Sequence, residues 1–312
     1  MQDYSLFDEI TNLSTEQINP ATENIDLAST REILNLINQE DKKVPNAVER
    51  EIPFIEQAVD IIYEILKQNG RLIYIGAGTS GRLGVIDASE CPPTFGTSPE
   101  TVQAIIAGGN QAMFAAQEGA EDNEQQAVID LNKKNLASID VVCGIAASGR
   151  TPYVKSAINY AHSIGCKTIM ITTSKREEIL ARGINADVFI CPYVGPEVIA
   201  GSTRMKSGTA QKLVMNMLTT ATMIKLGKTY GNIMVDLQQT NKKLVERSKN
   251  IIMKICNLDY NKASELLLQS DGNVKVAIVM AKTGTNQQSA INLLENAQGK
   301  IRDAIKGTTS NS

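Results

Sequence analysis

The chain has 312 residues, of which 42% are hydrophobic and 21% charged, with a formal net charge of −3 and an isoelectric point near 5.5. These proportions are typical of a globular protein with a substantial core and exclude a disordered or fibrous chain. The acidic balance offers no basic field, so we expect neither nucleic acid nor a membrane as a partner. No stretch resembles a signal peptide or a membrane-spanning helix, which predicts a cytoplasmic protein.

The cysteines and the single histidine argue against thiol or metal chemistry. Five cysteines are scattered, mostly in strand-like apolar runs, without a CxxC pair: Cys91, Cys143, Cys166, Cys191 and Cys256. We interpret them as small buried hydrophobic residues. His162 is expected on a helix face, and one histidine excludes a multi-histidine metal site. The sequence therefore predicts neither a metal nor a cofactor.

The N-terminal part of the chain is predicted to be a polar arm followed by helices. Residues 1–27 lack a sustained hydrophobic period, and we expect an arm that is loose or lies over a neighbouring segment. Apolar residues then recur at helical spacing over 28–40 and 44–69, which predicts two amphipathic helices. Gly70 is well placed to end the second helix.

From residue 71 onward, short apolar runs alternate with helical patterns. The runs that predict strands are 71–76, 102–107, 140–146, 167–172 and 187–192. Helices are expected at 81–89, within 110–135, at 152–164 and near 176–182. This alternation predicts an α/β fold whose parallel sheet is buried on both faces and binds ligands at the carboxyl ends of its strands.

The C-terminal part is predicted to be helical. A long helix is expected at about 204–227 and a linking helix at 233–248. The sequence then breaks into short amphipathic segments, which predicts a small helical bundle. We therefore divide the chain into an arm (1–27), a sheet domain with its N-terminal helices (28–240) and a bundle (241–312) that supports packing or dimer formation.

A glycine-rich turn after the first predicted strand is the clearest candidate binding element. Gly76, Gly78 and Gly81 let the backbone approach an anion closely, while Thr79 and Ser80 supply hydroxyl donors. The spacing formally matches the dinucleotide fingerprint, but no clear acidic residue follows at the required distance. Without a lysine after the last glycine, the turn is not a Walker loop. It is either a phosphate site or a turn that only joins strand and helix.

Two further loops rich in Gly, Ser and Thr follow strands of the same predicted sheet. The first contains Ser148, Gly149 and Thr151, and the second contains Ser202 and Thr203. Because the carboxyl ends of parallel strands share one edge of the sheet, the loops should converge there. Three hydroxyl-rich turns at one edge are what a cage around a phosphate group requires.

Two glutamates lie near these predicted loops. Glu90 ends the helix after the glycine-rich turn, and Glu121 follows the second strand. Acid–base chemistry uses carboxylates placed in this way. Spacing alone does not select this pair among 34 acidic residues, most of which are expected to be solvated surface charges.

Five segments of the sequence carry a resemblance to a known family. In chain order they are GAGTSGRLGVIDASECPPTFG, EGAED, GIAASGRTPYV, GSTRMKSGTAQKLVMNML and GNIMVD. They closely resemble the N-acetylmuramic acid 6-phosphate etherases in sequence and in order, most strongly over residues 28–240. The resemblance implies a sugar isomerase (SIS) type fold, with a five-stranded parallel sheet flanked by helices, a small C-terminal helical bundle and a homodimeric state.

The resemblance also implies a reaction and its residues. Members of this family cleave the lactyl ether of N-acetylmuramic acid 6-phosphate to N-acetylglucosamine 6-phosphate and D-lactate, in the recycling of cell-wall sugars. By match to the family motifs, Glu90 would protonate the leaving group and later activate water, and Glu121 would handle the proton on carbon 2. The substrate-binding residues implied are Gly78, Thr79, Ser80, Ser148, Gly149, Thr151, Ser202 and Thr203. Arg204 and Lys206 stay open, because either could assist an anionic group or pair with an acidic neighbour.

Two other functions are weighed against this one. A phosphosugar-binding regulatory protein, similar to the glucokinase regulatory protein, would share the GSTRMKSGT-type signature without turnover. Such regulators carry two sheet domains, whereas this chain has length for one. An aldose–ketose isomerase would use the same phosphate cage, but the isomerases do not share the DASECPP segment. The etherase is therefore favoured.

Overall fold

Residues 11, 13–237 and 242–309 are described by the computed structural model of this chain. Part of the expected arm, residues 1–10 and 12, and the expected boundary between residues 240 and 241 lie outside the described residues. No helix among the described residues is long and apolar enough to cross a membrane. The chain forms two compact units, one of residues up to Ser89 with Glu100–Thr219, the other of Glu90–Pro99 with Thr220 and the residues after it.

The first unit is built on a parallel sheet of five strands in the order β2-β1-β3-β4-β5. Its strands are β1 (Leu72–Gly76), β2 (Val102–Ile106), β3 (Val141–Ile145), β4 (Lys167–Ile171) and β5 (Val188–Ile190). All pairings are parallel, so the predicted sheet is confirmed. Chain order reverses between β1 and β3, and ligands of open α/β sheets bind at such a switch point.

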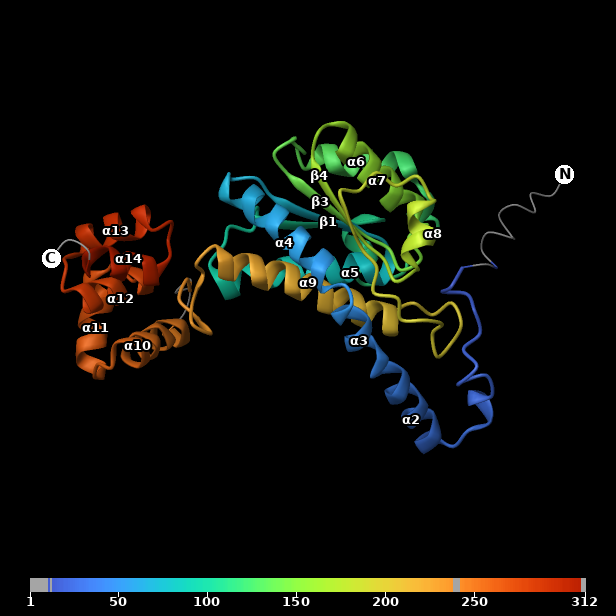
Figure 1. Ribbon diagram of the computed structural model, residues 1–312, viewed down its shortest axis with the longest axis horizontal. Coiled ribbons are helices and arrows are strands. Elements are labelled where there is room, and N and C mark those ends of the chain that lie inside the picture. The colour runs from blue at the N-terminus through green and yellow to red at the C-terminus, as the bar shows by residue number, and fades with distance from the viewer. Residues whose placement is uncertain (1–10, 12, 238–241, 310–312) are drawn as a thin grey trace. The chain divides into compact units, whose positions relative to one another are not determined.

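Helices cover both faces of this sheet, because the strands are apolar on both sides. Figure 1 shows α6 (Glu124–Lys133) and α7 (Pro152–Ser163) on one face and α4 (Ile52–Lys67) on the other. Every residue of β1 and β3 is buried. On the α7 side, Ile73 and Val142 of the sheet share a core with Leu131 and Ile158 of the helices.

Several helices have bounds that differ from those expected. The region 44–69 forms two helices, α3 (Lys43–Glu49) and α4, because Pro53 sits in the first turn of α4 and starts a new helix there. Upstream lies α2 (Thr30–Asp41), capped by Ser29 in a capping box with Glu32. Figure 1 also labels α8 (Arg176–Leu180) of this unit, together with α5 (Gly78–Phe95) and α9 (Lys206–Lys225), which belong to it as far as Ser89 and Thr219. The unit further contains the 3-10 turns Ile25–Leu27, Gly109–Met113 and Ala120–Asp122.

The linking helix expected at 233–248 is wrong at its beginning. Residues 229–234 instead form an antiparallel hairpin of β6 (Thr229–Tyr230) and β7 (Ile233–Met234), and α10 (Lys242–Cys256) starts later. The hairpin turns at Gly231-Asn232, where Gly231 has a φ of +59°. A two-residue loop with glycine or asparagine is the preferred connection of a tight hairpin, and this local preference overrides the helical pattern.

The predicted helical bundle forms the core of the second unit. After α10 it contains α11 (Tyr260–Gln269), α12 (Val274–Thr283), α13 (Gln287–Asn296) and α14 (Ile301–Thr309). The polar breaks in the sequence are helix starts, since the side chains of Asp259, Asn273 and Asn286 each accept a backbone N–H of the following first turn. Ile252, Ala277, Ile278 and Ala290 are fully buried in the shared core.

Candidate active site

The glycines of the turn between β1 and α5 have two different roles. A Cβ on Gly76 would come within 2.8 Å of the Gly81 nitrogen, and a Cβ on Gly81 within 2.8 Å of the Gly76 oxygen. These two glycines therefore let the strand and the helix pack closely. Gly78 has a φ of +53°, and a Cβ there would meet nothing within 4 Å. Gly78 thus faces open space beside the first amides of α5.

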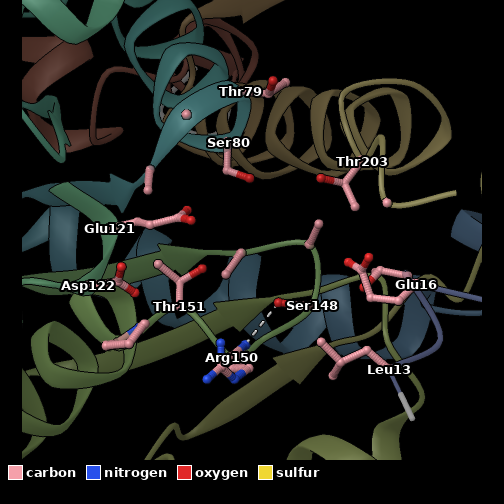
Figure 2. Close-up of a pocket in the computed structure, with 17 residues that line it drawn as sticks. Leu13, Glu16, Thr79, Ser80, Glu121, Asp122, Ser148, Arg150, Thr151 and Thr203 are labelled. Carbon is pink, nitrogen blue, oxygen red and sulfur yellow. Dashed lines mark hydrogen bonds between the residues drawn. The ribbon is translucent and has the colours of Figure 1, made fainter. Parts of the chain in front are cut away.

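A cavity of about 370 Å³, here called the main cavity, lies where β1 and β3 end. This is the switch point of the sheet, and the loops that follow the two strands provide opposite walls. Figure 2 shows hydroxyl and carboxylate side chains directed into it from both sides. The lining side chains include Leu13, Thr15, Glu16, Thr79, Ser80, Glu121, Asp122, Ser148, Arg150, Thr151 and Thr203.

Most of the predicted substrate-binding residues line the main cavity. They are Gly78, Thr79, Ser80, Ser148, Thr151 and Thr203. Gly149 and Ser202 are not among the lining residues. Gly149 has a φ of +64°, and a Cβ there would come within 2.2 Å of the Ile179 side chain, so the loop needs this glycine for its shape. The three loops therefore converge as expected, although not through every residue.

Two helices direct their positive ends at the main cavity. Gly78 begins α5, and Thr151 is the N-cap of α7, while both residues line the cavity. The Thr151 side chain makes no capping hydrogen bond, so its hydroxyl is not committed to the helix. Free amides and helix dipoles at such ends favour an anion. The arrangement suits a phosphate group.

The N-terminus of α9, by contrast, is already occupied by a carboxylate of the protein. Glu197 is 1% exposed, and its oxygens accept the backbone N–H groups of Lys206 at 3.0 Å and Ser207 at 2.9 Å. This internal anion satisfies the amides that a phosphate would otherwise use. The third loop therefore contributes to the cavity through Thr203 and not through its helix end.

Lys206 and Arg204, which the sequence left open, both lie outside the main cavity lining. Lys206 is 1% exposed, and its Nζ donates to Glu40 Oε2 at 2.7 Å and to the Val194 carbonyl at 3.0 Å. A buried lysine needs such partners, because its charge is costly to desolvate alone. Lys206 thus pairs with an acidic neighbour. Arg204 is exposed.

Ser80 is held by a residue of α9 that the sequence did not single out. Its Oγ donates to Gln211 Oε1 at 2.9 Å, and both side chains are buried. The buried Gln211 Nε2 has no hydrogen-bond partner among the described residues. A half-turn of this amide would let Nε2 donate to Ser80 Oγ, which would free the serine proton for a phosphate oxygen. Gln211 is therefore suited to orient the Ser80 hydroxyl.

Comparison with known proteins identifies the family. A model of the glucokinase regulatory protein N-terminal SIS domain matches residues 54–162, and a model of the C-terminal lid domain of that protein matches residues 231–275. An N-acetylmuramic acid 6-phosphate etherase of Salinibacter ruber is 55% identical over 304 residues, which are 97% of each chain. The chain belongs to the N-acetylmuramic acid 6-phosphate etherase family.

Other etherases and two solved structures are similar to the chain. The etherase of Oceanobacillus iheyensis is 55% identical over 93% of this chain and 98% of its own, and that of Pasteurella multocida 54% identical over 94% and 96%. A structure of a phosphoheptose isomerase of Francisella tularensis is 17% identical, covers 64% of this chain and 99% of its own, and has a TM-score of 0.46. That of a phosphoheptose isomerase of Neisseria gonorrhoeae is also 17% identical, covers 62% and 97%, and has the same TM-score of 0.46.

The two glutamates that the etherase family resemblance selects have different surroundings. Glu121 lies in the 3-10 turn Ala120–Asp122, lines the main cavity, and is directed into it between Ser80 and Thr151 in Figure 2. Glu90 is exposed on α5 and is not among the residues that line this cavity. The catalytic pair stays a prediction.

The N-terminal arm contributes three residues to the lining of the main cavity. Leu13, Thr15 and Glu16 reach it because the arm is fastened to the third loop, where Gly201 N donates to the Thr15 carbonyl at 3.0 Å. Thr22 Oγ1 also donates to the Val198 carbonyl at 2.9 Å. Sequence reasoning missed these residues, since the arm has no periodic pattern.

All five cysteines are free, and Cys256 alone is not fully buried. Burial raises the pKa of the Cys166 thiol to about 11 and that of Cys191 to about 12. Such thiols stay protonated at neutral pH and are poor nucleophiles. The interpretation of the cysteines as buried hydrophobic residues is therefore confirmed for the four buried ones.

Asp87 is a buried carboxylate that ties α5 to the sheet and to α9. It accepts hydrogen bonds from Tyr74 Oη at 3.1 Å, Asn216 Nδ2 at 2.8 Å and Thr219 Oγ1 at 3.3 Å. Burial raises the pKa of this carboxyl, and the three hydrogen bonds only partly oppose that shift. The folded state therefore binds the Asp87 proton more tightly than the unfolded chain does.

The difference in Tm between Asp87→Asn and wild type is expected to shift in favour of the variant by about 2 to 4 °C from pH 4 to pH 7. At either pH the amide lacks one of the two acceptor oxygens that Tyr74, Asn216 and Thr219 use. A raised folded-state pKa stabilises the wild type below the folded pKa, and that contribution is lost as the pH rises through it. The neutral amide does not titrate. Thermal melts at several pH values check this, with exposed Asp26→Asn as the control. A difference in Tm that does not vary with pH would contradict this expectation.

Ser80→Ala is expected to weaken phosphosugar binding by about 1.5 to 3 kcal/mol, because the family resemblance predicts that the Ser80 hydroxyl donates to the charged phosphate. Titration calorimetry with N-acetylglucosamine 6-phosphate measures this cost. Ser163→Ala is a matched control, since this exposed serine is the last residue of α7, at the end of the helix away from the main cavity. Its hydroxyl donates to the Tyr160 carbonyl. Equal affinities for Ser80→Ala and wild type would remove Ser80 from the phosphate site.

Proposed function

We propose that this chain is a lyase that cleaves the D-lactyl ether of N-acetylmuramic acid 6-phosphate to N-acetylglucosamine 6-phosphate and D-lactate. The observation that carries the proposal is one cavity at the sheet switch point in which a cage of hydroxyls and two helix ends face Glu121. The etherases that resemble the chain over nearly its full length support the choice of substrate. We infer that the chain acts on this phosphosugar in the cytoplasm, during the recycling of cell-wall peptidoglycan.

Substrate binding begins with the phosphate. The hydroxyls of Thr79, Ser80, Ser148 and Thr151, together with the first amides of α5 and α7, are the donors offered to its oxygens. Binding of the phosphate holds the sugar in one orientation relative to Glu121. Proton removal then becomes an effectively unimolecular step between two groups that are already in position. Opening of the sugar ring puts an aldehyde next to carbon 2 and makes the proton on that carbon acidic.

The proposed reaction is an elimination followed by a hydration. Glu121 removes the proton from carbon 2, the electron pair of that bond forms a double bond between carbons 2 and 3, and the bond from carbon 3 to the ether oxygen breaks. The leaving oxygen needs a proton, because an alkoxide is a poor leaving group, and Glu90 supplies it. Water activated by Glu90 then adds its oxygen to carbon 3, and carbon 2 regains a proton. No electrons are exchanged with a cofactor.

The position of Glu90 favours a homodimer in which the two carboxylates come from different copies. Glu90 is exposed and is not among the residues that line the main cavity of its own copy. In a two-fold dimer, the same surface of each copy meets its equivalent, so one copy can lend Glu90 to the cavity of the other. We infer that the partner copy completes each active site in this way.

Lactate release in isotopically labelled water tests the proposed function. Purified chain is incubated with N-acetylmuramic acid 6-phosphate, D-lactate is measured enzymatically, and the sugar product is examined by mass spectrometry. The proposal requires D-lactate together with one solvent oxygen at carbon 3. Tight binding of the sugar phosphate by well-folded chain without lactate release would support a regulatory phosphosugar-binding protein instead.

A further inference from the structure

A smaller cavity of about 210 Å³, here called the side cavity, adjoins the main cavity. The two share Ala77, Gly78 and Glu121 as lining residues. Glu121 therefore stands at the boundary between them. A ligand whose reacting carbon lies at Glu121 in the main cavity can extend a substituent past this residue into the side cavity.

Arg82 provides the cation of the side cavity. It lies in the first turns of α5, and its Nε donates to the Met113 carbonyl at 3.2 Å. That bond holds the guanidinium in place and uses only Nε. Both terminal nitrogens are available to a ligand, since Arg82 has no other hydrogen bond or ion pair among the described residues. A planar guanidinium with four free N–H groups is suited to grip a carboxylate with two parallel hydrogen bonds.

Small side chains form much of the remaining wall. Ala107, Ala112 and Ala116 line the side cavity, and Ala112 is buried. Methyl-bearing walls leave room for a short substituent and provide apolar contact for a methyl group, while a volume of about 210 Å³ accommodates a three-carbon acid. Glu118 also lines the cavity, but it is exposed, so solvent screens its charge.

We propose that the side cavity is the subsite for the lactyl group, with Arg82 binding its carboxylate. This inference rests on the proposed function. In the substrate, the lactyl ether is attached to carbon 3, directly beside the carbon 2 whose proton Glu121 removes. A residue that serves carbon 2 and borders both cavities therefore leaves the carbon 3 substituent in the side cavity. Arg82 is a specificity residue that recognises the part of the substrate that leaves.

The test separates recognition of the lactyl carboxylate from recognition of the sugar phosphate. Arg82→Met and Arg82→Lys are compared with wild type, and Arg31→Met, an exposed arginine of α2, is the control for loss of one positive charge. Steady-state kinetics use N-acetylmuramic acid 6-phosphate and an analogue whose lactyl carboxylate is an amide. Calorimetry measures binding of N-acetylglucosamine 6-phosphate, which has no lactyl group, and thermal melts confirm folding.

Arg82→Met is expected to lower kcat/KM for the natural substrate by roughly 10- to 150-fold, mainly through KM. Binding of N-acetylglucosamine 6-phosphate should stay within twofold of wild type. The amide analogue should be poor for wild type and no worse for Arg82→Met, because the interaction is already lost. Arg82→Lys should fall between the two, since lysine keeps the charge without the fork.

Other outcomes overturn the inference, and they differ from failure of the proposed function. If wild type releases lactate but Arg82→Met weakens product binding as much as substrate turnover, Arg82 contacts the sugar phosphate or the acetamido group. A fall in kcat alone, with a shifted pH profile, would mean that Arg82 acts on Glu121. Unchanged kinetics would remove Arg82 altogether. Absence of lactate release from wild type would instead refute the etherase activity, whatever Arg82 does.

Discussion

Glu121→Gln is expected to reduce kcat for lactate release by about 10²- to 10⁴-fold, because the amide cannot accept the proton from carbon 2. Binding of the sugar phosphate should be nearly unchanged, since the proposed phosphate donors are other residues that line the main cavity. The glutamine is close in shape to the glutamate, so the variant should fold. Steady-state lactate release and calorimetry with N-acetylglucosamine 6-phosphate measure the two effects.

Exchange of the carbon 2 proton with solvent is a second, independent measurement of the role of Glu121. In deuterated water, the wild type should exchange the carbon 2 proton of N-acetylglucosamine 6-phosphate for deuterium, and Glu121→Gln should not. Glu124→Gln is a matched control, because this exposed glutamate lies only three positions further along, in the first turn of α6. If Glu121→Gln retained more than a tenth of wild-type turnover, the base would have to be sought among other residues.

Glu90→Gln is expected to abolish most lactate release as well, and mixing it with Glu121→Gln should restore activity. If the carboxylates of one site come from two copies, a mixed dimer contains one site with both glutamates intact. Random exchange of subunits at equal amounts would then give about a quarter of wild-type activity from two inactive parents. The measurement is lactate release after co-refolding or co-expression with two affinity tags.

The mixing experiment has an equally clear negative result. If Glu90 and Glu121 of the same chain formed each site, every site in a mixed dimer would lack one of them, and no activity would return. Sizing of each variant by light scattering is needed beside it, since a monomeric chain would also fail to complement. A monomer with full wild-type activity would refute the shared site directly.

Local patterns predicted the sheet unit well because its strands carry their own signal. The strands β1 to β5 lie within the five predicted apolar runs, and the glycine-rich turn and the loop with Ser148 follow neighbouring strands. Parallel strands bring such loops to one edge whatever their distance in sequence. The hairpin at 229–234 was missed, since two-residue strands are too short to show a period.

Pairings between distant segments account for what the sequence did not predict at the site. Lys206 carries the same charge whether it binds phosphate or a carboxylate, and its pairing with Glu40 depends on the packing of α2 near the start of α9. Glu197 likewise accepts two backbone hydrogen bonds at the α9 N-terminus, and no sequence motif predicts them. Arm residues such as Thr15 reach the cavity through backbone contacts with the third loop.

The sequence by itself determined the α/β class, the hydroxyl-bearing loops and, through its motifs, the etherase family. Each of these depends on short stretches of consecutive residues. Tertiary structure decided which residues share a cavity: Glu121 lines the main cavity with Ser80 and Thr151, and it lines the side cavity with Arg82. Glu90 is not among the lining residues of either cavity. The physical reason is that side-chain identity fixes what a group can do, whereas only the packing of distant segments fixes what it meets.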